Sequence, residues 1–88
     1  MVIKYKRLNP EVICTKLHEE SVLLNMKTGT YFGLDEVGTV IWERLELNNS
    51  FSEIIKYLVE HFNVDQKIVN KDITDFLTIL KDNQILEE

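Results

Sequence analysis

The first third of the chain alternates between apolar and polar positions, which is the pattern of a strand covered mainly on one face. Residues 11–18 place Ile13 and Leu17 on one side and Val12 and Cys14 on the other. This alternation predicts a first strand over these residues.

The next apolar segments predict a β-hairpin. Residues 21–26 form a short apolar run, residues 27–30 a turn with Gly29 at the position that favours a positive φ, and residues 30–34 a second run with two aromatic side chains. Extended structure is also expected within residues 2–8. The amino-terminal part therefore predicts a small antiparallel sheet.

From Asp35 onward the apolar spacing becomes helical. Asp35 is a suitable N-cap, Ser50 and Glu53 match a capping box, and Asp65 can cap a further helix. Apolar residues then recur at intervals of three and four positions, which places them on one face of each helix. The spacing predicts three helices, over residues 36–47, 51–63 and 66–82.

Strands come first and helices follow, an order typical of an α+β fold with helices against one face of a sheet. The predicted fold is winged helix-turn-helix-like, a three-stranded antiparallel sheet followed by three helices. Ile85 and Leu86 are expected to fold back onto the core. The absence of a repeat or linker predicts one domain over residues 1–88.

Charge decides against one function that such a fold commonly has. The chain carries 10 Lys and Arg against 15 Asp and Glu, a net charge of −5. A winged-helix DNA-binding regulator is the alternative from a different class, but its second helix would offer only Lys56 against Glu53 and Glu60. We therefore expect no nucleic-acid partner. No segment resembles a membrane span or a secretory signal, so a cytoplasmic protein without membrane contact is expected.

No catalytic constellation is visible in the sequence. Motifs for phosphate, dinucleotide or metal binding are absent, so neither a cofactor nor a metal is expected. A thiol enzyme built on Cys14 is a further alternative, but a lone thiol in a strand is more often a small packed side chain. His18 and His61 are expected to be structural or solvated. The chain is predicted not to be an enzyme.

The strand at residues 30–34 lacks the Lys, Pro or bulge that usually protects a sheet edge. An extended peptide could pair with this edge and place its side chains against the third helix. Asp72 and Asp75 flank the apolar stripe of that helix, where they could meet a basic partner. Alternatively, the edge is short, or is covered by the amino-terminal segment or by a second copy of the chain.

Three segments resemble the PqqD-like family. They are TGTYFGLDEVGTVIW at residues 28–42, EIIKYLVEHFNV at residues 53–64 and DITDFLTIL at residues 72–80. The resemblance implies a recognition element that binds the leader part of a ribosomally made precursor peptide and presents it to modifying or cleaving enzymes. It also implies the winged-helix-like fold already predicted.

By position, the resemblance points to a leader that pairs with the third strand and lies against the third helix. The residues implied are Thr30, Tyr31, Phe32, Gly33, Leu34, Asp72, Asp75, Phe76 and Ile79. A free-standing chain of this size is most similar to the discrete leader-binding protein of a lasso-peptide pathway, which acts with a leader peptidase and then a cyclase. The alternative is a partner of a radical SAM enzyme, as in pyrroloquinoline quinone synthesis. We expect a monomer or a weak homodimer, since a second copy could pair where the leader would.

Overall fold

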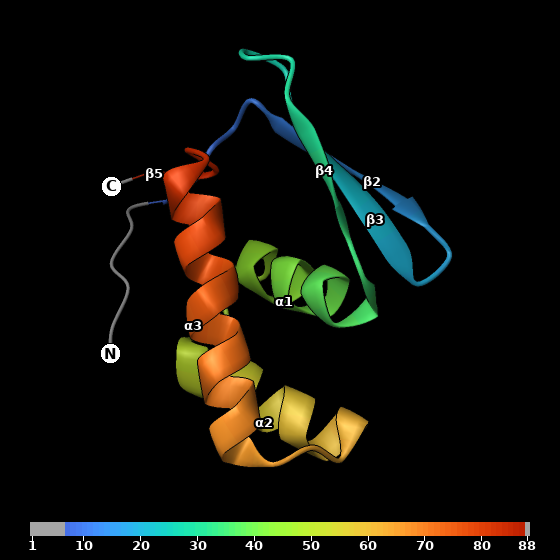
Figure 1. The fold of residues 1–88 in the computed structure, drawn as a ribbon, viewed down its shortest axis with the longest axis vertical. Coiled ribbons are helices and arrows are strands. Elements are labelled where there is room, and N and C mark those ends of the chain that lie inside the picture. The colour runs from blue at the N-terminus through green and yellow to red at the C-terminus, as the bar shows by residue number, and fades with distance from the viewer. Residues whose placement is uncertain (1–6, 88) are drawn as a thin grey trace.

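The computed structural model of the protein describes residues 7–87 (Figure 1). It contains a sheet on one side of the molecule and three helices, of which the first lies against the sheet and the other two pack together beside it (Figure 1). In chain order the elements are β1 (Arg7–Leu8), β2 (Val12–Leu17), β3 (Glu20–Asn25), β4 (Tyr31–Leu34), α1 (Glu36–Glu46), α2 (Phe51–Phe62), α3 (Gln66–Asp82) and β5 (Leu86–Glu87). The predicted α+β fold, three antiparallel strands followed by three helices, is confirmed.

The main sheet has the order β2-β3-β4, and each strand is antiparallel to its neighbour. Leu23 lies opposite Cys14 on one side and opposite Phe32 on the other. Gly29 has a φ of +76° in the turn between β3 and β4, as its position in the sequence predicts. With β3 in the centre, β2 and β4 are both edge strands.

Each helix begins at the cap that the sequence predicts. The Asp35 carboxylate accepts a hydrogen bond from the backbone N–H of Gly38 at 2.8 Å. Ser50 and Glu53 form the reciprocal capping box, with distances of 3.2 Å and 2.8 Å. Asp65 caps α3. Because such caps each contribute about 1 kcal/mol, the three polar breaks fix where the helices start.

The core lies between the inner face of the sheet and the three helices. It contains Leu23 from β3, Trp42 from α1, Leu58 from α2 and Leu77 and Leu80 from α3, each 2% exposed or less. Burial of a side chain of this size contributes about 1.5–3 kcal/mol. The apolar stripes predicted for the helices are therefore the faces that pack together.

The two ends of the described chain lie side by side. β1 pairs with β5, so that Leu8 is opposite Leu86, and the backbone N–H of Asn9 donates to the carbonyl of Ile85 at 2.7 Å. Ile85 and Leu86 are buried, which confirms that this segment folds back onto the core. Of the extended structure expected within residues 2–8, residues 7–8 form β1 and residues 2–6 lie outside the described residues.

The alternation predicted for the first strand is confirmed, but its more apolar side is the solvent side. Ile13 and Leu17 are 46% and 59% exposed, whereas Val12 and Cys14 are half-buried against the core. The helices cover only the face to which Val12 and Cys14 point. Apolar identity alone therefore does not indicate which face of β2 is covered.

Candidate functional site

A groove lies between the end of β4, the start of α1 and the middle of α3. Its volume is about 520 Å³ and it is open to solvent along one side. In Figure 1, α3 stands along the side of β4 that β3 does not occupy. The groove is lined by Gly33, Leu34, Asp35, Val37, Gly38, Ile41, Asp72, Asp75, Phe76 and Ile79.

Strand β4 presents an open backbone edge beside this groove. The N–H of Asn25 donates to the carbonyl of Thr30 at 2.9 Å, so this pair is a hydrogen-bonded one. The two-residue period of an antiparallel ladder then directs the backbone groups of Phe32 and Leu34 toward β3. The N–H and C=O groups of Tyr31 and Gly33 therefore point to the open edge, where a further strand can bind them.

The structure brings together six of the nine residues that the sequence singles out. Gly33 and Leu34 from β4 share the groove with four residues of α3. These four are Asp72, Asp75, Phe76 and Ile79.

The other three residues lie outside the groove. Thr30 precedes β4 and belongs to the turn, where its hydroxyl lies 2.7 Å from that of Thr28. Tyr31 is 72% exposed, and Phe32 packs against the core. Tyr31 still contributes its backbone to the open edge, so its position matters even though its side chain points away.

Four groove residues were missed by the sequence reasoning, and all lie at the junction of β4 and α1. They are Asp35, Val37, Gly38 and Ile41. A Cβ atom at Gly38 would lie 3.3 Å from Oδ1 of Asp35, 3.4 Å from Cβ of Leu34 and 3.5 Å from Cε1 of Phe76. Gly38 therefore lies where β4, α1 and α3 meet at the groove.

The groove is apolar at its floor and acidic at its wall. Val37, Ile41 and Phe76 provide half-buried or buried apolar surface, while Asp72 and Asp75 are exposed. None of its lining residues is Lys, Arg or His. The groove therefore suits an apolar side chain at its floor and a positive charge, if any, at its wall.

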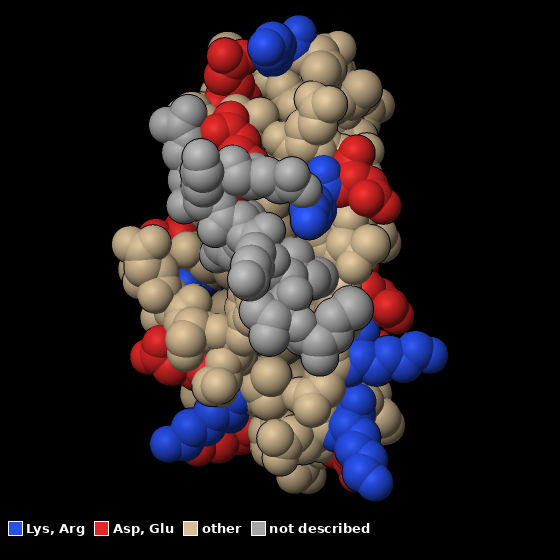
Figure 2. Space-filling view, turned by 90° about the vertical axis from the view of Figure 1, so that its left-hand side faces the viewer, with Lys and Arg blue, Asp and Glu red and all other residues tan. Residues whose placement is uncertain are grey.

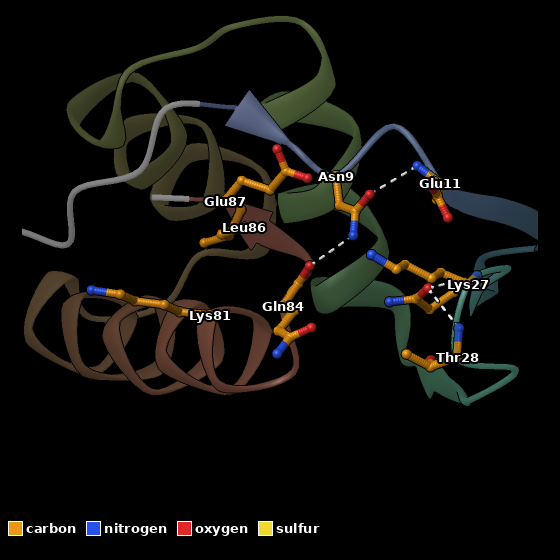
Figure 3. A pocket seen from close by; sticks show the side chains of 9 residues that line it. Asn9, Glu11, Lys27, Thr28, Lys81, Gln84, Leu86 and Glu87 are labelled. Carbon is orange, nitrogen blue, oxygen red and sulfur yellow. Dashed lines mark hydrogen bonds between the residues drawn. The ribbon is translucent and has the colours of Figure 1, made fainter.

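A second hollow, of about 360 Å³, lies at the carboxyl end of α3 and has a different character (Figure 3). The Asn9 side chain donates to the carbonyl of Gln84 at 3.0 Å and accepts from the N–H of Glu11. Lys27 and Lys81 line it together with Glu11 and Glu87, so its charges are balanced. Its polar side chains join the end of α3 to the turns of the sheet, which indicates a structural junction.

Cys14 lies on β2, away from the groove, in surroundings that favour the protonated thiol. Burial raises the pKa of the Cys14 thiol; the hydrogen bond with Ser21 and the charge of Lys16 oppose this effect, and the carboxylates of Glu46 and Glu43 add to it. A nucleophilic cysteine requires the opposite, a thiolate stabilised near neutral pH. The surroundings of Cys14 therefore do not favour the thiol-enzyme alternative.

The described residues contain no group of three or more His, Cys, Asp and Glu side chains that could hold a metal ion. Within residues 7–87, no helix combines the length and the apolar character needed to cross a membrane. Figure 2 shows the face of the molecule on the α3 side. Outside the grey atoms, acidic and basic side chains are interspersed and do not form one continuous basic area.

The fold and the groove define a small winged-helix-like module with an open strand edge beside a helix. The family model described as coenzyme PQQ synthesis protein D (PqqD) matches residues 20–86, and the chain belongs to this family. No curated protein gives a significant match.

Two solved structures are similar to this chain. The structure "TbiB1 in Complex with the TbiA(beta) Leader Peptide" shares 38% sequence identity with this chain and superposes with a TM-score of 0.87. The match covers 93% of this chain and 95% of the TbiB1 chain. "Lasso peptide synthetase B1 complexed with the leader peptide" shares 27% identity, covers 93% of this chain and 96% of its own, with a TM-score of 0.85. Both relatives are thus complexes with leader peptides.

Proposed function

We propose that this protein binds the leader segment of a ribosomally synthesised precursor peptide by strand addition to β4. The observation that carries this proposal is the open edge of β4 beside the groove along α3. The similarity to TbiB1, whose structure contains a leader peptide, supports it. In this proposal the leader becomes the fourth strand of the sheet.

In this proposal the backbone and the side chains of the leader contribute differently to binding. Hydrogen bonds to the N–H and C=O groups of Tyr31 and Gly33 supply affinity that depends little on sequence. Each such bond contributes about 0.5–1.5 kcal/mol net. Alternate side chains of the leader enter the groove, where Phe76 and Ile79 provide apolar contact, and these contacts supply specificity.

The proposed role is delivery rather than catalysis. A leader held by this protein, which in turn docks on an enzyme, brings the core of the precursor to the active site at a raised effective concentration. The partner we propose is the leader peptidase of a lasso-peptide pathway, followed by its cyclase. Neither step needs a reactive residue in this chain.

Two alternatives are less well supported. A role beside a radical SAM enzyme fits the name of the PqqD family, but one of the two similar structures is a lasso peptide synthetase B1, which favours the lasso pathway. A DNA-binding role has no support from these similarities. The interspersed charges on the α3 face also argue against it, because affinity for phosphates depends on gathered Lys and Arg.

The test is calorimetric titration with two synthetic peptides. One is the leader of the precursor encoded beside this protein, and the other is the TbiA(beta) leader that TbiB1 binds. Binding of the neighbouring leader at one peptide per chain is expected. Absence of binding to both peptides, together with tight and salt-dependent binding to duplex DNA, would overturn the proposal in favour of a regulator.

Amide shifts in an NMR titration locate the bound peptide. Shifts are expected along β4 and along the Asp72 to Ile79 turns of α3, with β2 nearly unchanged. Shifts confined to other elements would contradict the groove assignment even where the leader binds.

We propose further that the protein is a monomer or a weak dimer without leader, because a second β4 can occupy the same edge. Light scattering after size-exclusion chromatography should then show any dimer dissociate when leader is added. A stable dimer that binds leader at one peptide per chain would contradict competition for the edge.

A further inference from the structure

The groove beside β4 is asymmetric along α3. Asp72 and Asp75 lie one helical turn apart at the end nearer the start of α3, and Asp35 adds a third carboxylate from the β4–α1 junction. Phe76 and Ile79 follow toward the other end, and Ile79 is 52% exposed. Along the α3 wall of the groove, one end is therefore acidic and the other apolar, above the apolar floor that Val37 and Ile41 provide.

The residues that line the acidic end of the groove include no Lys, Arg or His. Among the described residues, Asp72 and Asp75 form no ion pair, and the groove contains no basic side chain. Asp35 differs, because its carboxylate accepts a hydrogen bond from the N–H of Gly38 at 2.8 Å and so caps α1. Negative charge at Asp72 and Asp75 is thus available to a bound peptide that crosses the groove.

The spacing of these features matches the repeat of an extended chain. On α3, the pair Phe76 and Ile79 follows the pair Asp72 and Asp75 by four residues. Four residues correspond to about 6 Å along a helix axis. Side chains two residues apart on one face of a strand are separated by about 6.6 Å. A segment paired with β4 can therefore place two alternate side chains at the two ends of the groove.

We infer that the groove selects a leader segment in which a Lys or Arg and a large apolar residue are separated by one position. The basic side chain lies against Asp72 and Asp75, and the apolar side chain lies against Phe76 and Ile79. The inference rests on the proposed function and specifies its substrate class. The strand edge holds any extended chain, and the two ends of the groove distinguish one sequence from another.

The test compares charge-removing variants in calorimetric titrations with the synthetic leader of the precursor encoded beside this protein. Asp72→Asn combined with Asp75→Asn should weaken binding by about fivefold to tenfold, because two exposed ion pairs are lost. The matched control is Glu60→Gln, which removes a carboxylate from α2 outside the groove. The control should bind as the unchanged protein does.

Salt and peptide variants identify the cause of any loss. Binding by the unchanged protein should weaken between about 0.05 M and about 0.5 M salt, and the double variant should lose most of this dependence. Replacing one particular Lys or Arg of the leader by Gln should lower the affinity as much as the double variant does. The double variant should bind this altered leader no more weakly than it binds the original leader.

The outcomes separate this inference from the proposed function. If the unchanged protein does not bind the leader, the proposed function fails. If it binds, but the double variant keeps the same affinity and the same salt dependence, or the leader has no basic residue in its paired segment, the inference about charge is wrong while leader binding stands.

Discussion

The two edges of the main sheet differ in what lies beside them. The N–H of Met26 donates to the carbonyl of Glu11 at 2.9 Å, so the two-residue period directs the backbone groups of Cys14 and Lys16 to the open side of β2. β2 is thus an open edge, as β4 is. However, the ammonium of Lys16 lies 3.4 Å from the Glu43 carboxylate at this edge, whereas α3 and its groove accompany β4.

This difference indicates what converts an edge strand into a site for a peptide. An unpaired backbone alone accepts any strand, including one from an aggregating neighbour, and a Lys at the edge is a common protection against this. β4 has no such charge in the strand itself, but it lies beside a surface that can select side chains. The PqqD match begins at residue 20, so it contains β4 and α3 but not β2.

The largest expected effect comes from blocking the β4 edge. In Gly33→Pro, the ring removes an N–H that points to the open side and not to β3, so leader affinity should fall at least about tenfold while the fold persists. Calorimetry with the neighbouring leader measures the affinity, and circular dichroism checks the fold.

The matched control for this change is Lys16→Pro, which places the same ring at the equivalent position of the β2 edge. It should leave leader affinity unchanged. Equal losses in both variants would mean that the two edges do not differ as proposed.

The next effect concerns the groove. Phe76→Ala should lower leader affinity by about tenfold, because the half-buried ring forms much of the apolar floor. Phe62→Ala, a half-buried phenylalanine of α2 outside the groove, is the control. Thermal unfolding of both variants separates lost binding from lost stability. If Phe62→Ala weakens leader binding as much as Phe76→Ala does, the floor assignment is wrong.

The smallest effect is expected at Cys14, on the β2 side. Its raised pKa means that the folded protein holds the thiol proton more tightly than the unfolded chain does. Stability linked to this group is therefore fully present below the ordinary thiol pKa and decreases as the pH rises above about 9. Iodoacetamide should modify Cys14 slowly near pH 7, more slowly than in denaturant, and Cys14→Ser should bind leader normally. Rapid modification near pH 7 would revive the thiol-enzyme alternative.

The sequence predicts the fold well where local chemistry determines it. Asp35, Ser50 and Asp65 each satisfy backbone donors within their own first turn, so the helix starts follow from short segments. Gly29 acts in the same local way in the turn between β3 and β4.

Features that depend on distant contacts were harder to predict. The covered face of β2 is determined by helices that follow later in the chain, and the apolar Ile13 and Leu17 misrepresent it. The pairing of β1 with β5 joins residues almost a chain length apart and has no local pattern. In the groove, Asp72 and Asp75 were indicated by their positions on the predicted third helix, and Phe76 and Ile79 as groove residues by the family resemblance. The place of Gly38 in the groove has no local pattern in the sequence, because its closeness to Phe76 appears only when α1 and α3 are placed together.

The pairing of β1 with β5 also has a practical consequence. Because Leu8 and Leu86 are neighbours, the two ends of the described residues lie together, while the groove is lined by residues 33–41 and 72–79. Such an arrangement favours insertion into a loop of a host protein and circular permutation through a short linker. The module could therefore be built into an unrelated enzyme as a cassette, so that leader recognition is transferred without redesign of the host.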